Sequence, residues 1–160
     1  MTGEAPELSL TRRYRFSAAH RLHAPQLTDE RNREIYGKCN NPFGHGHDYV
    51  LEVTVRGRVD PRLGRLIRLD EMDRLVRGVL LDHVEHRNLN AEVEEFATVV
   101  PTTENLAEVA ARRLARAWPS AFPDGPARLE RVGIQETRNN IFEVSAPLAE
   151  NGETDANQVT

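Results

Sequence analysis

The sequence predicts a single α+β domain in which two strands, two helices and two further strands follow one another. Three observations predict it: apolar and polar residues alternate toward both ends, two helical patterns lie between, and the chain has 160 residues. A chain of this length suits one compact domain and is short for two. We expect the domain to span residues 1–145. Residues 146–160 carry no basic or aromatic residue and are predicted to form a disordered tail.

Alternation with a period of two predicts a half-buried strand over residues 8–20. One parity carries Leu8, Leu10, Tyr14, Phe16 and Ala18, and only Arg12 interrupts this apolar side. A second strand is predicted to begin near His47 and to reach Val55 by the same pattern. The polar stretch between the two strands, residues 24–46, is expected to be a long loop, and long loops in compact domains are commonly functional.

Two helices are predicted in the centre of the chain. After a turn at residues 60–64, apolar residues at helical spacing predict a helix over residues 70–81. The second helix is predicted to start within Pro101-Thr102-Thr103-Glu104, with a threonine cap and an acidic residue in its first turn. Its apolar stripe continues until Pro119.

Composition excludes several classes of function. The chain has 21 basic and 25 acidic residues, and 20 of the basic residues are scattered arginines without a basic stripe, so we expect no nucleic-acid partner. No apolar run approaches the ~18–20 residues of a membrane span, so no membrane partner is expected. The lone Cys39 excludes an intrachain disulfide framework, and the absence of a signal-peptide pattern favours a cytoplasmic location. A phosphorylated small molecule stays open, because arginine binds phosphate bidentately.

Three of the six histidines are expected to converge. His45 and His47 lie two residues apart in an extended segment and therefore point to the same side. His20 ends the first strand with the parity of Ala18, so antiparallel pairing of the strands would bring the three imidazoles together. Three neutral imidazoles suit zinc with an open fourth position, which is typical of catalytic zinc. His23 lies beyond the strand and is predicted not to be a ligand.

Cys39 has two interpretations on pattern alone. A single cysteine is commonly an inert buried thiol. Lys38 and two asparagines flank it, however, and a polar setting can favour a thiolate that acts as a base or nucleophile. The residue pattern leaves both interpretations open.

Alternation returns over residues 129–136 and 141–144 and predicts a closing hairpin. Glu136 has the parity of Val132 and Ile134, so its carboxylate should point with the apolar side chains. A carboxylate in that position is costly unless it is paired or binds a ligand. The alternative is that the strand has ended and Glu136 is a solvated turn residue.

Five segments of the sequence together resemble the 6-pyruvoyl-tetrahydropterin synthase family. In family order they read FSAAHRL (16–22), GKCNNPFGHGH (37–47), HRNLN (86–90), PTTEN (101–105) and QETRNN (135–140). The resemblance implies a tunnelling fold, or T-fold, with a four-stranded antiparallel sheet and two helices inserted between the strand pairs. It also implies assembly into a homohexamer made of two trimers.

The resemblance implies an activity and a role for each site residue. The implied reaction converts 7,8-dihydroneopterin triphosphate to 6-pyruvoyl-tetrahydropterin and eliminates triphosphate, which makes the enzyme a carbon–oxygen lyase. Zinc would be bound once per subunit, with magnesium as a second candidate cation. The implied roles are zinc ligation by His20, His45 and His47, proton abstraction by Cys39, relay by His86 with Glu85 from a neighbouring subunit, and pterin anchoring by Glu136 helped by Thr102, Thr103 and Glu104.

The sequence departs from the family pattern at the relay. The family usually has Leu-Asp-His there, whereas this chain has Val84-Glu85-His86, and Leu81-Asp82-His83 spells the motif three residues early. The sequence that follows His86 favours the later register.

Two alternative functions remain open from the sequence. One is the 6-carboxy-tetrahydropterin synthase branch of queuosine and 7-deazapurine synthesis, which usually has a shorter cysteine-to-histidine spacer than the five residues found here. The other is a non-catalytic zinc- or pterin-binding homologue.

Overall fold

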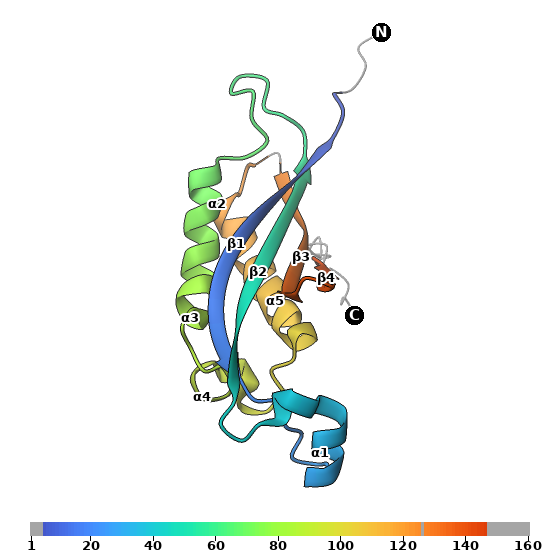
Figure 1. Cartoon of the computed structure of the whole chain (residues 1–160). Helices are drawn as coiled ribbons and strands as arrows, with labels where there is room; N and C mark the ends of the chain where they lie inside the picture. The colour runs from blue at the N-terminus through green and yellow to red at the C-terminus, as the bar shows by residue number, and fades with distance from the viewer. Residues whose placement is uncertain (1–4, 126, 147–160) are drawn as a thin grey trace, which may run out of the picture.

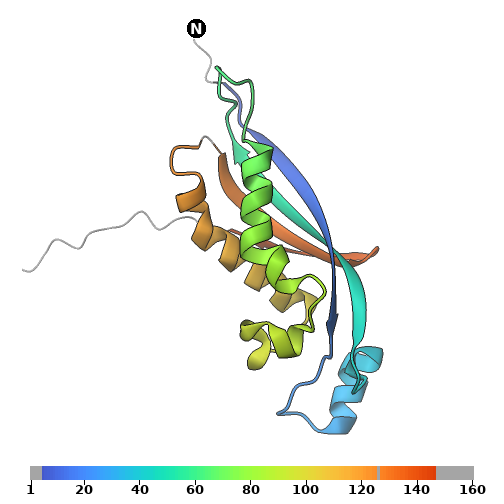
Figure 2. The ribbon, with the colours of Figure 1, turned by 90° about the vertical axis from the view of Figure 1, so that its left-hand side faces the viewer.

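A four-stranded antiparallel sheet in the order β1-β2-β3-β4 forms one layer of the molecule. The structure is a computed structural model that describes residues 5–125 and 127–146. The strands are β1 (Leu8–His20), β2 (His45–Gly57), β3 (Ala127–Thr137) and β4 (Asn140–Ser145). Helices cover one face of this sheet (Figures 1 and 2), which confirms the predicted α+β class and T-fold topology. The predicted disordered tail, apart from Ala146, lies outside the described residues.

The first two strands pair along their whole length. The register runs from Leu8 opposite Gly57 to His20 opposite His45. The prediction of the first strand is confirmed, and the second begins at His45, two residues earlier than predicted. This extension places both histidines of the His-Gly-His segment within β2.

Arg12 interrupts the apolar face of β1 because it binds a helix. Its Nε and Nη2 donate to the two carboxylate oxygens of Asp73 at 2.6 Å each, and the Tyr14 hydroxyl donates to Oδ1 at 2.8 Å. Asp73 belongs to α2 (Leu69–Val76). The arrangement ties the sheet to this helix with a bidentate ion pair.

The two predicted central helices are present and slightly longer than expected. The first continues from α2 through a π-helical turn, Arg77–Leu81, into α3 (Asp82–Val84). The second is α5 (Thr103–Ala121), and the expected threonine cap is Thr102, whose hydroxyl accepts from the Asn105 amide at 3.2 Å. Pro119 lies inside α5 near its end rather than terminating it.

The expectation of a loop over residues 24–46 is wrong. The segment contains α1 (Asp29–Tyr36), followed by a 3-10 turn over Gly37–Asn40. Thr28 caps α1 by accepting from the Arg31 amide. The helix has no apolar stripe because Asn32 is the one residue of α1 that is buried, so the periodicity that reveals packed helices is missing. The short helix α4 (Leu89–Glu92) and the 3-10 turn Glu94–Ala97 were likewise not predicted.

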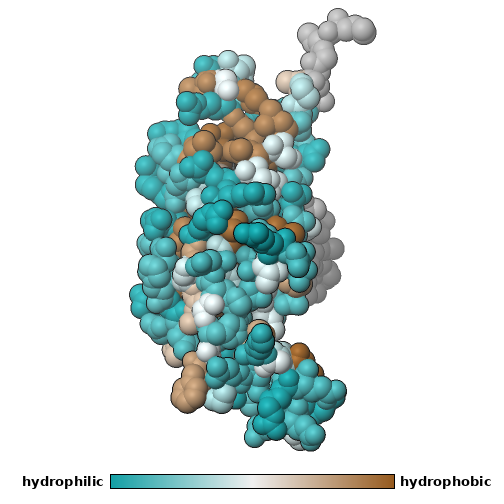
Figure 3. Space-filling model, viewed as in Figure 1, coloured by the Kyte–Doolittle hydropathy of each residue, from teal (hydrophilic) through white to brown (hydrophobic). Residues whose placement is uncertain are grey.

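The core fills the space between the sheet and its helices. Its fully buried members include Leu51, Val53, Met72, Leu80, Leu106, Leu114 and Ile134. The opposite face of the sheet is polar, with the Arg13–Glu52 ion pair at 2.8 Å and the Thr11–Thr54 hydrogen bond at 2.8 Å. Figure 3 shows a mainly hydrophilic surface in this view, with a hydrophobic area near the connection between β2 and α2. None of the helices within the described residues is long and apolar enough to cross a membrane.

Candidate metal centre

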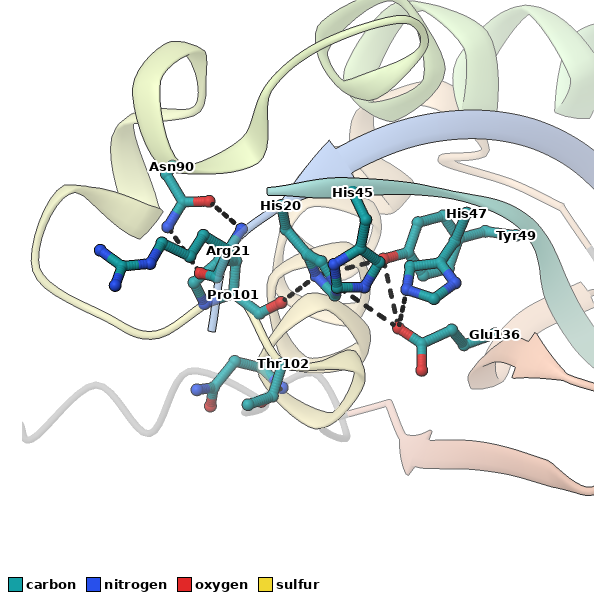
Figure 4. Close-up of polar contacts among 10 residues, drawn as sticks. His20, Arg21, His45, His47, Tyr49, Asn90, Pro101, Thr102 and Glu136 are labelled. Atoms are coloured by element: carbon teal, nitrogen blue, oxygen red, sulfur yellow. Dashed lines mark hydrogen bonds and ion pairs between the residues drawn. The ribbon is translucent and has the colours of Figure 1, made fainter. Parts of the chain in front are cut away.

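The β1–β2 register brings three imidazoles together. His20 pairs with His45, and His47 pairs with Ala18 two residue pairs further into the sheet. The ring centroids lie 4.8 Å apart for His20 and His45, 5.0 Å for His20 and His47, and 4.6 Å for His45 and His47. The rings meet edge to face, and Figure 4 shows them side by side between the strand ends.

The turn before β2 is held close to β1 by a glycine. Gly44 has φ +70, and a Cβ built on it would lie 2.9 Å from the carbonyl oxygen of His20. Any larger residue would therefore combine left-handed backbone strain with a clash against backbone. Glycine at this position allows His45 to lie directly opposite His20.

The ring nitrogens are arranged to bind a cation. His20 is 1% exposed, and its Nδ1 lies 2.9 Å from the carbonyl oxygen of Pro101. A neutral ring donates Nδ1–H to that oxygen, so its Nε2 lone pair faces the Nε2 of His45 at 3.3 Å. Tetrahedral ligands at a zinc–nitrogen distance of ~2.0–2.1 Å are separated by about 3.3–3.4 Å, which matches this spacing.

Two further observations fit a metal site. The buried His45 Nδ1 and His47 Nε2 have no hydrogen-bond partner within the described chain. Burial lowers the pKa of His20 and of His45 below the usual range, so both rings are held neutral. Neutral imidazoles with available lone pairs are the form that metal ions require.

Cys39 completes a four-residue group. Single ligand atoms of His20, Cys39, His45 and His47 all lie within 4.8 Å of one another, a group that could hold a metal ion. The Cys39 carbonyl accepts from the Leu22 amide at 2.8 Å, which fixes the turn against the end of β1. Burial, and then the charge of Glu136, raise the pKa of the Cys39 thiol. The polar residues beside Cys39 therefore do not produce a thiolate in the isolated chain.

Glu136 lies inside the site, and the interpretation of it as a solvated turn residue is wrong. Its Oε1 is 3.5 Å from His47 Nε2 and 3.8 Å from His20 Nε2. The buried Tyr49 hydroxyl donates to the same oxygen at 3.4 Å. The β3–β4 register shifts between Gln135 and Thr137, and such an irregularity can re-aim a side chain.

The start of α5 contacts the cluster through its backbone. Pro101 supplies the carbonyl that orients His20, while the Thr102 hydroxyl caps the helix. Thr103 is 5% exposed, and Glu104 is exposed to solvent. The three residues expected to assist pterin binding therefore begin next to the cluster, and their binding role stays a prediction.

The expected relay lies elsewhere in the single chain. His86 has a positive φ of 57, and its amide donates to the Ser17 carbonyl at 2.7 Å, which joins this segment to the edge of β1. Its side chain lines a cavity of about 530 Å³ shared with His47 and Asp48, and Cys39 does not line that cavity. Glu85 is 3.7 Å from Arg77. One described chain therefore does not place His86 in the group that contains Cys39.

The two remaining histidines, His83 and His23, lie outside the cluster and have partners of their own. His83 is exposed in the short helix α3, and its Nε2 lies 3.1 Å from the Gly78 carbonyl oxygen. His23 lies outside the cluster with Nδ1 3.1 Å from Asn40 Nδ2. Sequence reasoning missed Tyr49 and Pro101. The parity of Tyr49 with His47 could have indicated the first, whereas the backbone contact of Pro101 depends on how α5 docks.

Known proteins resemble this chain over most of its length. A family model described as 6-pyruvoyl tetrahydropterin synthase matches residues 9–147. A 6-pyruvoyl tetrahydrobiopterin synthase of Poecilia reticulata is 46% identical over 132 residues, which cover 82% of this chain and 86% of the relative. The solved structure of the 6-pyruvoyl tetrahydropterin synthase of Caenorhabditis elegans is 43% identical with a TM-score of 0.78, and the match covers 88% of this chain and 96% of that one.

A relative from the sister branch is less similar. A 6-carboxy-5,6,7,8-tetrahydropterin synthase of Rickettsia typhi is 25% identical over 152 residues, covering 86% of this chain and 99% of the relative. The matched residues 9–147 include the histidine cluster, and the solved structure agrees with the fold. The chain belongs to the 6-pyruvoyl tetrahydropterin synthase family.

Proposed function

We propose that this chain is a zinc-dependent 6-pyruvoyl-tetrahydropterin synthase. It would convert 7,8-dihydroneopterin triphosphate to 6-pyruvoyl-tetrahydropterin with elimination of triphosphate, as a carbon–oxygen lyase. The observation that carries this proposal is the group of His20, Cys39, His45 and His47, whose ligand atoms lie within 4.8 Å in a chain of this family. The higher identity to pyruvoyl than to carboxy relatives, 46% against 25%, favours the pyruvoyl product.

The three histidines are the proposed zinc ligands. The Pro101 carbonyl fixes the tautomer of His20, and the other two rings carry the buried nitrogens that have no partner in the described chain. Bound zinc would act as a Lewis acid on the hydroxyl groups of the substrate side chain and acidify the adjacent C–H bonds. Magnesium would be bound through the substrate's phosphates rather than by a protein cage.

Cys39 is the proposed base. Its thiol belongs to the same group as the three imidazoles, so it lies within reach of a side chain held there. Because the pKa of Cys39 is raised in the isolated chain, we assign the removal of its proton to His86 of a neighbouring subunit, oriented by Glu85. His86 lines a cavity with His47 that Cys39 does not line, which supports a relay between subunits rather than within one chain.

Glu136 is the proposed anchor of the pterin ring. A carboxylate accepts two parallel hydrogen bonds, and the pterin offers adjacent N–H donors of that geometry. Tyr49 donates to Oε1 and leaves Oε2 with no hydrogen-bond partner in the described chain. Thr102, Thr103 and Glu104 would complete this end of the site from the start of α5.

The assembly would be a cytoplasmic homohexamer built from two trimers. The outer strands of the sheet are β1 and β4, and residues 86–88 already pair with the end of β1. The rest of the β1 edge and the outer edge of β4 have no partner strand in the described chain, and sheet edges are the usual sites of strand pairing between subunits. The relay from a neighbouring subunit requires an oligomer of this kind.

Product analysis with 7,8-dihydroneopterin triphosphate tests the proposal. The zinc-loaded protein should release triphosphate and form 6-pyruvoyl-tetrahydropterin. A 6-carboxy product with acetaldehyde would assign the chain to the sister activity. Absence of turnover by the zinc-loaded oligomer would identify a binding protein instead of an enzyme.

A further inference from the structure

Three cationic side chains near the metal centre have no carboxylate partner. Elsewhere the arginines commonly pair, as Arg113 does with Glu95 at 2.7 Å. Within the described residues, Arg21, Arg33 and Lys38 form no ion pair. All three line one cavity of about 740 Å³, which we call the cationic cavity.

The cationic cavity adjoins the histidine cluster. His45 lines it directly, and Arg21 follows His20 in the chain. Asp29 is the one carboxylate among its lining residues, so three positive charges face one negative charge. A cavity with this excess of positive charge beside a metal centre favours an anionic group.

Arg21 is positioned for an anion by its neighbours. Its amide donates to Asn90 Oδ1 at 2.8 Å, and its carbonyl accepts from Asn90 Nδ2 at 2.9 Å, so the backbone is held on both sides. The guanidinium Nε donates to the Asn40 carbonyl at 3.1 Å. The two terminal nitrogens have no hydrogen-bond partner in the described chain, and such a fork binds phosphate bidentately at little cost in side-chain entropy.

Arg33 and Lys38 line the cationic cavity from α1 and from the turn that follows it, neither of which was predicted from the sequence. Arg33 lies in the last turn of α1, and Lys38 follows in the 3-10 turn. Gly37 between them has φ +53, a conformation that glycine adopts without the steric cost of a Cβ, and its amide donates to the Arg33 carbonyl at the end of the helix. The turn thereby brings two cations from successive elements to one cavity.

The cationic cavity and the expected pterin anchor lie at opposite ends of the cluster. In Figure 4 the three imidazoles separate Arg21 on one side from Glu136 on the other. A substrate with a ring at one end and a polyphosphate at the other could therefore span the metal. We propose that Arg21, Arg33 and Lys38 form the subsite for the triphosphate group, which deepens the proposed function and rests on it.

Binding of inorganic triphosphate to the zinc-loaded protein tests the subsite. Titration calorimetry should give a dissociation constant that rises with salt concentration, and zinc analysis after each titration should show that the metal is retained. Arg33→Gln and Lys38→Gln should each weaken binding about tenfold, because each removes one charge-assisted contact with phosphate. Arg116→Gln is the matched control, since Arg116 is exposed on α5 and lines none of the cavities described.

Arg21 is tested with a more conservative substitution, because it follows the proposed zinc ligand His20 in the chain. Arg21→Lys keeps the charge and removes the fork, so triphosphate should bind several-fold more weakly while the zinc content is unchanged. Equal affinities in the wild type, Arg33→Gln, Lys38→Gln and Arg116→Gln would overturn the subsite. So would equal losses in all three glutamine variants, which would indicate general electrostatics.

The outcomes separate the subsite from the proposed function. Turnover of 7,8-dihydroneopterin triphosphate with an unchanged KM in Arg33→Gln and Lys38→Gln would reject the subsite and keep the function. Triphosphate affinity that depends on these two residues, without any turnover, would keep the anion site and reject the function.

Discussion

The Nε2 atoms of His20 and His45 lie 3.3 Å apart where the paired ends of β1 and β2 meet. His20 already uses Nδ1 on the Pro101 carbonyl, and burial lowers the pKa of both rings. Two neutral rings whose Nε2 lone pairs face each other at this distance are stabilised by a cation bound between them. The strand register thus creates the metal centre, because it sets the spacing between the ligand nitrogens.

Zinc binding should depend on His20, His45 and His47 and not on His23. Each of the first three contributes a nitrogen to the cluster, whereas His23 contacts Asn40 outside it. Metal analysis of the four single alanine variants after gel filtration measures this. Retention of zinc in His45→Ala together with its loss in His23→Ala would contradict the assignment.

Cys39→Ala should keep zinc and assembly and lose most of the turnover. Removing a general base typically costs ~10²–10⁴-fold in rate. Steady-state kinetics with 7,8-dihydroneopterin triphosphate measure the loss, and zinc content controls for damage to the centre because Cys39 belongs to the same four-residue group. A variant that turns over like the wild type would identify Cys39 as a bystander.

His86→Ala should abolish most activity, whereas His83→Ala should be mild. His86 lines a cavity together with His47, whereas His83 Nε2 lies 3.1 Å from the Gly78 carbonyl oxygen. Glu85→Gln should reduce the rate less than His86→Ala, because it leaves the imidazole in place. Rates for the three variants decide the register of the relay. An inactive His83→Ala beside an active His86→Ala would support the earlier motif.

The sequence predicts the strands and the three-histidine cluster well because both follow from parity. Once β1 and β2 are recognised, antiparallel pairing is enough to bring His20 opposite His45. The exposed helix α1 was missed because it buries no apolar stripe, although Thr28 and the acidic residues after it supplied a capping signal. The contact of Pro101 with His20 could not be predicted, since it depends on where α5 packs rather than on any local pattern.

Asp73 should make stability depend on pH in the acid range. Hydrogen bonding to Arg12 is the main cause that holds the pKa of this carboxyl below its usual range. The stabilisation is therefore fully present above pH ~4, the unfolded value, and is lost as pH falls through the lower folded value. Asp73→Asn should cost about 1 kcal/mol at pH 7 after allowance for solvent screening.

Urea unfolding of Asp73→Asn and of the wild type at pH 7 and near pH 3 measures this dependence. The difference between the two proteins should shrink at the lower pH, because there the Asp73 carboxyl of the unfolded wild-type chain is largely protonated. Asp70→Asn on the same helix is the control, because its ion pairs with Arg68 and Arg74 are exposed and longer, at 3.2 and 3.4 Å. A difference that grows on acidification would show that Asp73 does not act through its charge.

Gly44→Ala should destabilise the fold and weaken zinc binding together, and Gly64→Ala separates the two causes. Both glycines have positive φ, +70 and +65, so alanine costs about 1 kcal/mol at either position from backbone strain. At Gly64 an added Cβ meets nothing within 4 Å, whereas at Gly44 it would lie 2.9 Å from the His20 carbonyl oxygen. That clash must push the turn before His45 away from β1 and widen the gap between the ligand nitrogens.

Urea unfolding of the metal-free proteins and zinc titration should therefore show a stability loss in both variants and a loss of zinc affinity in Gly44→Ala alone. Equal zinc affinity in the two variants would mean that the turn yields without moving His45, and that the glycine serves only the local backbone.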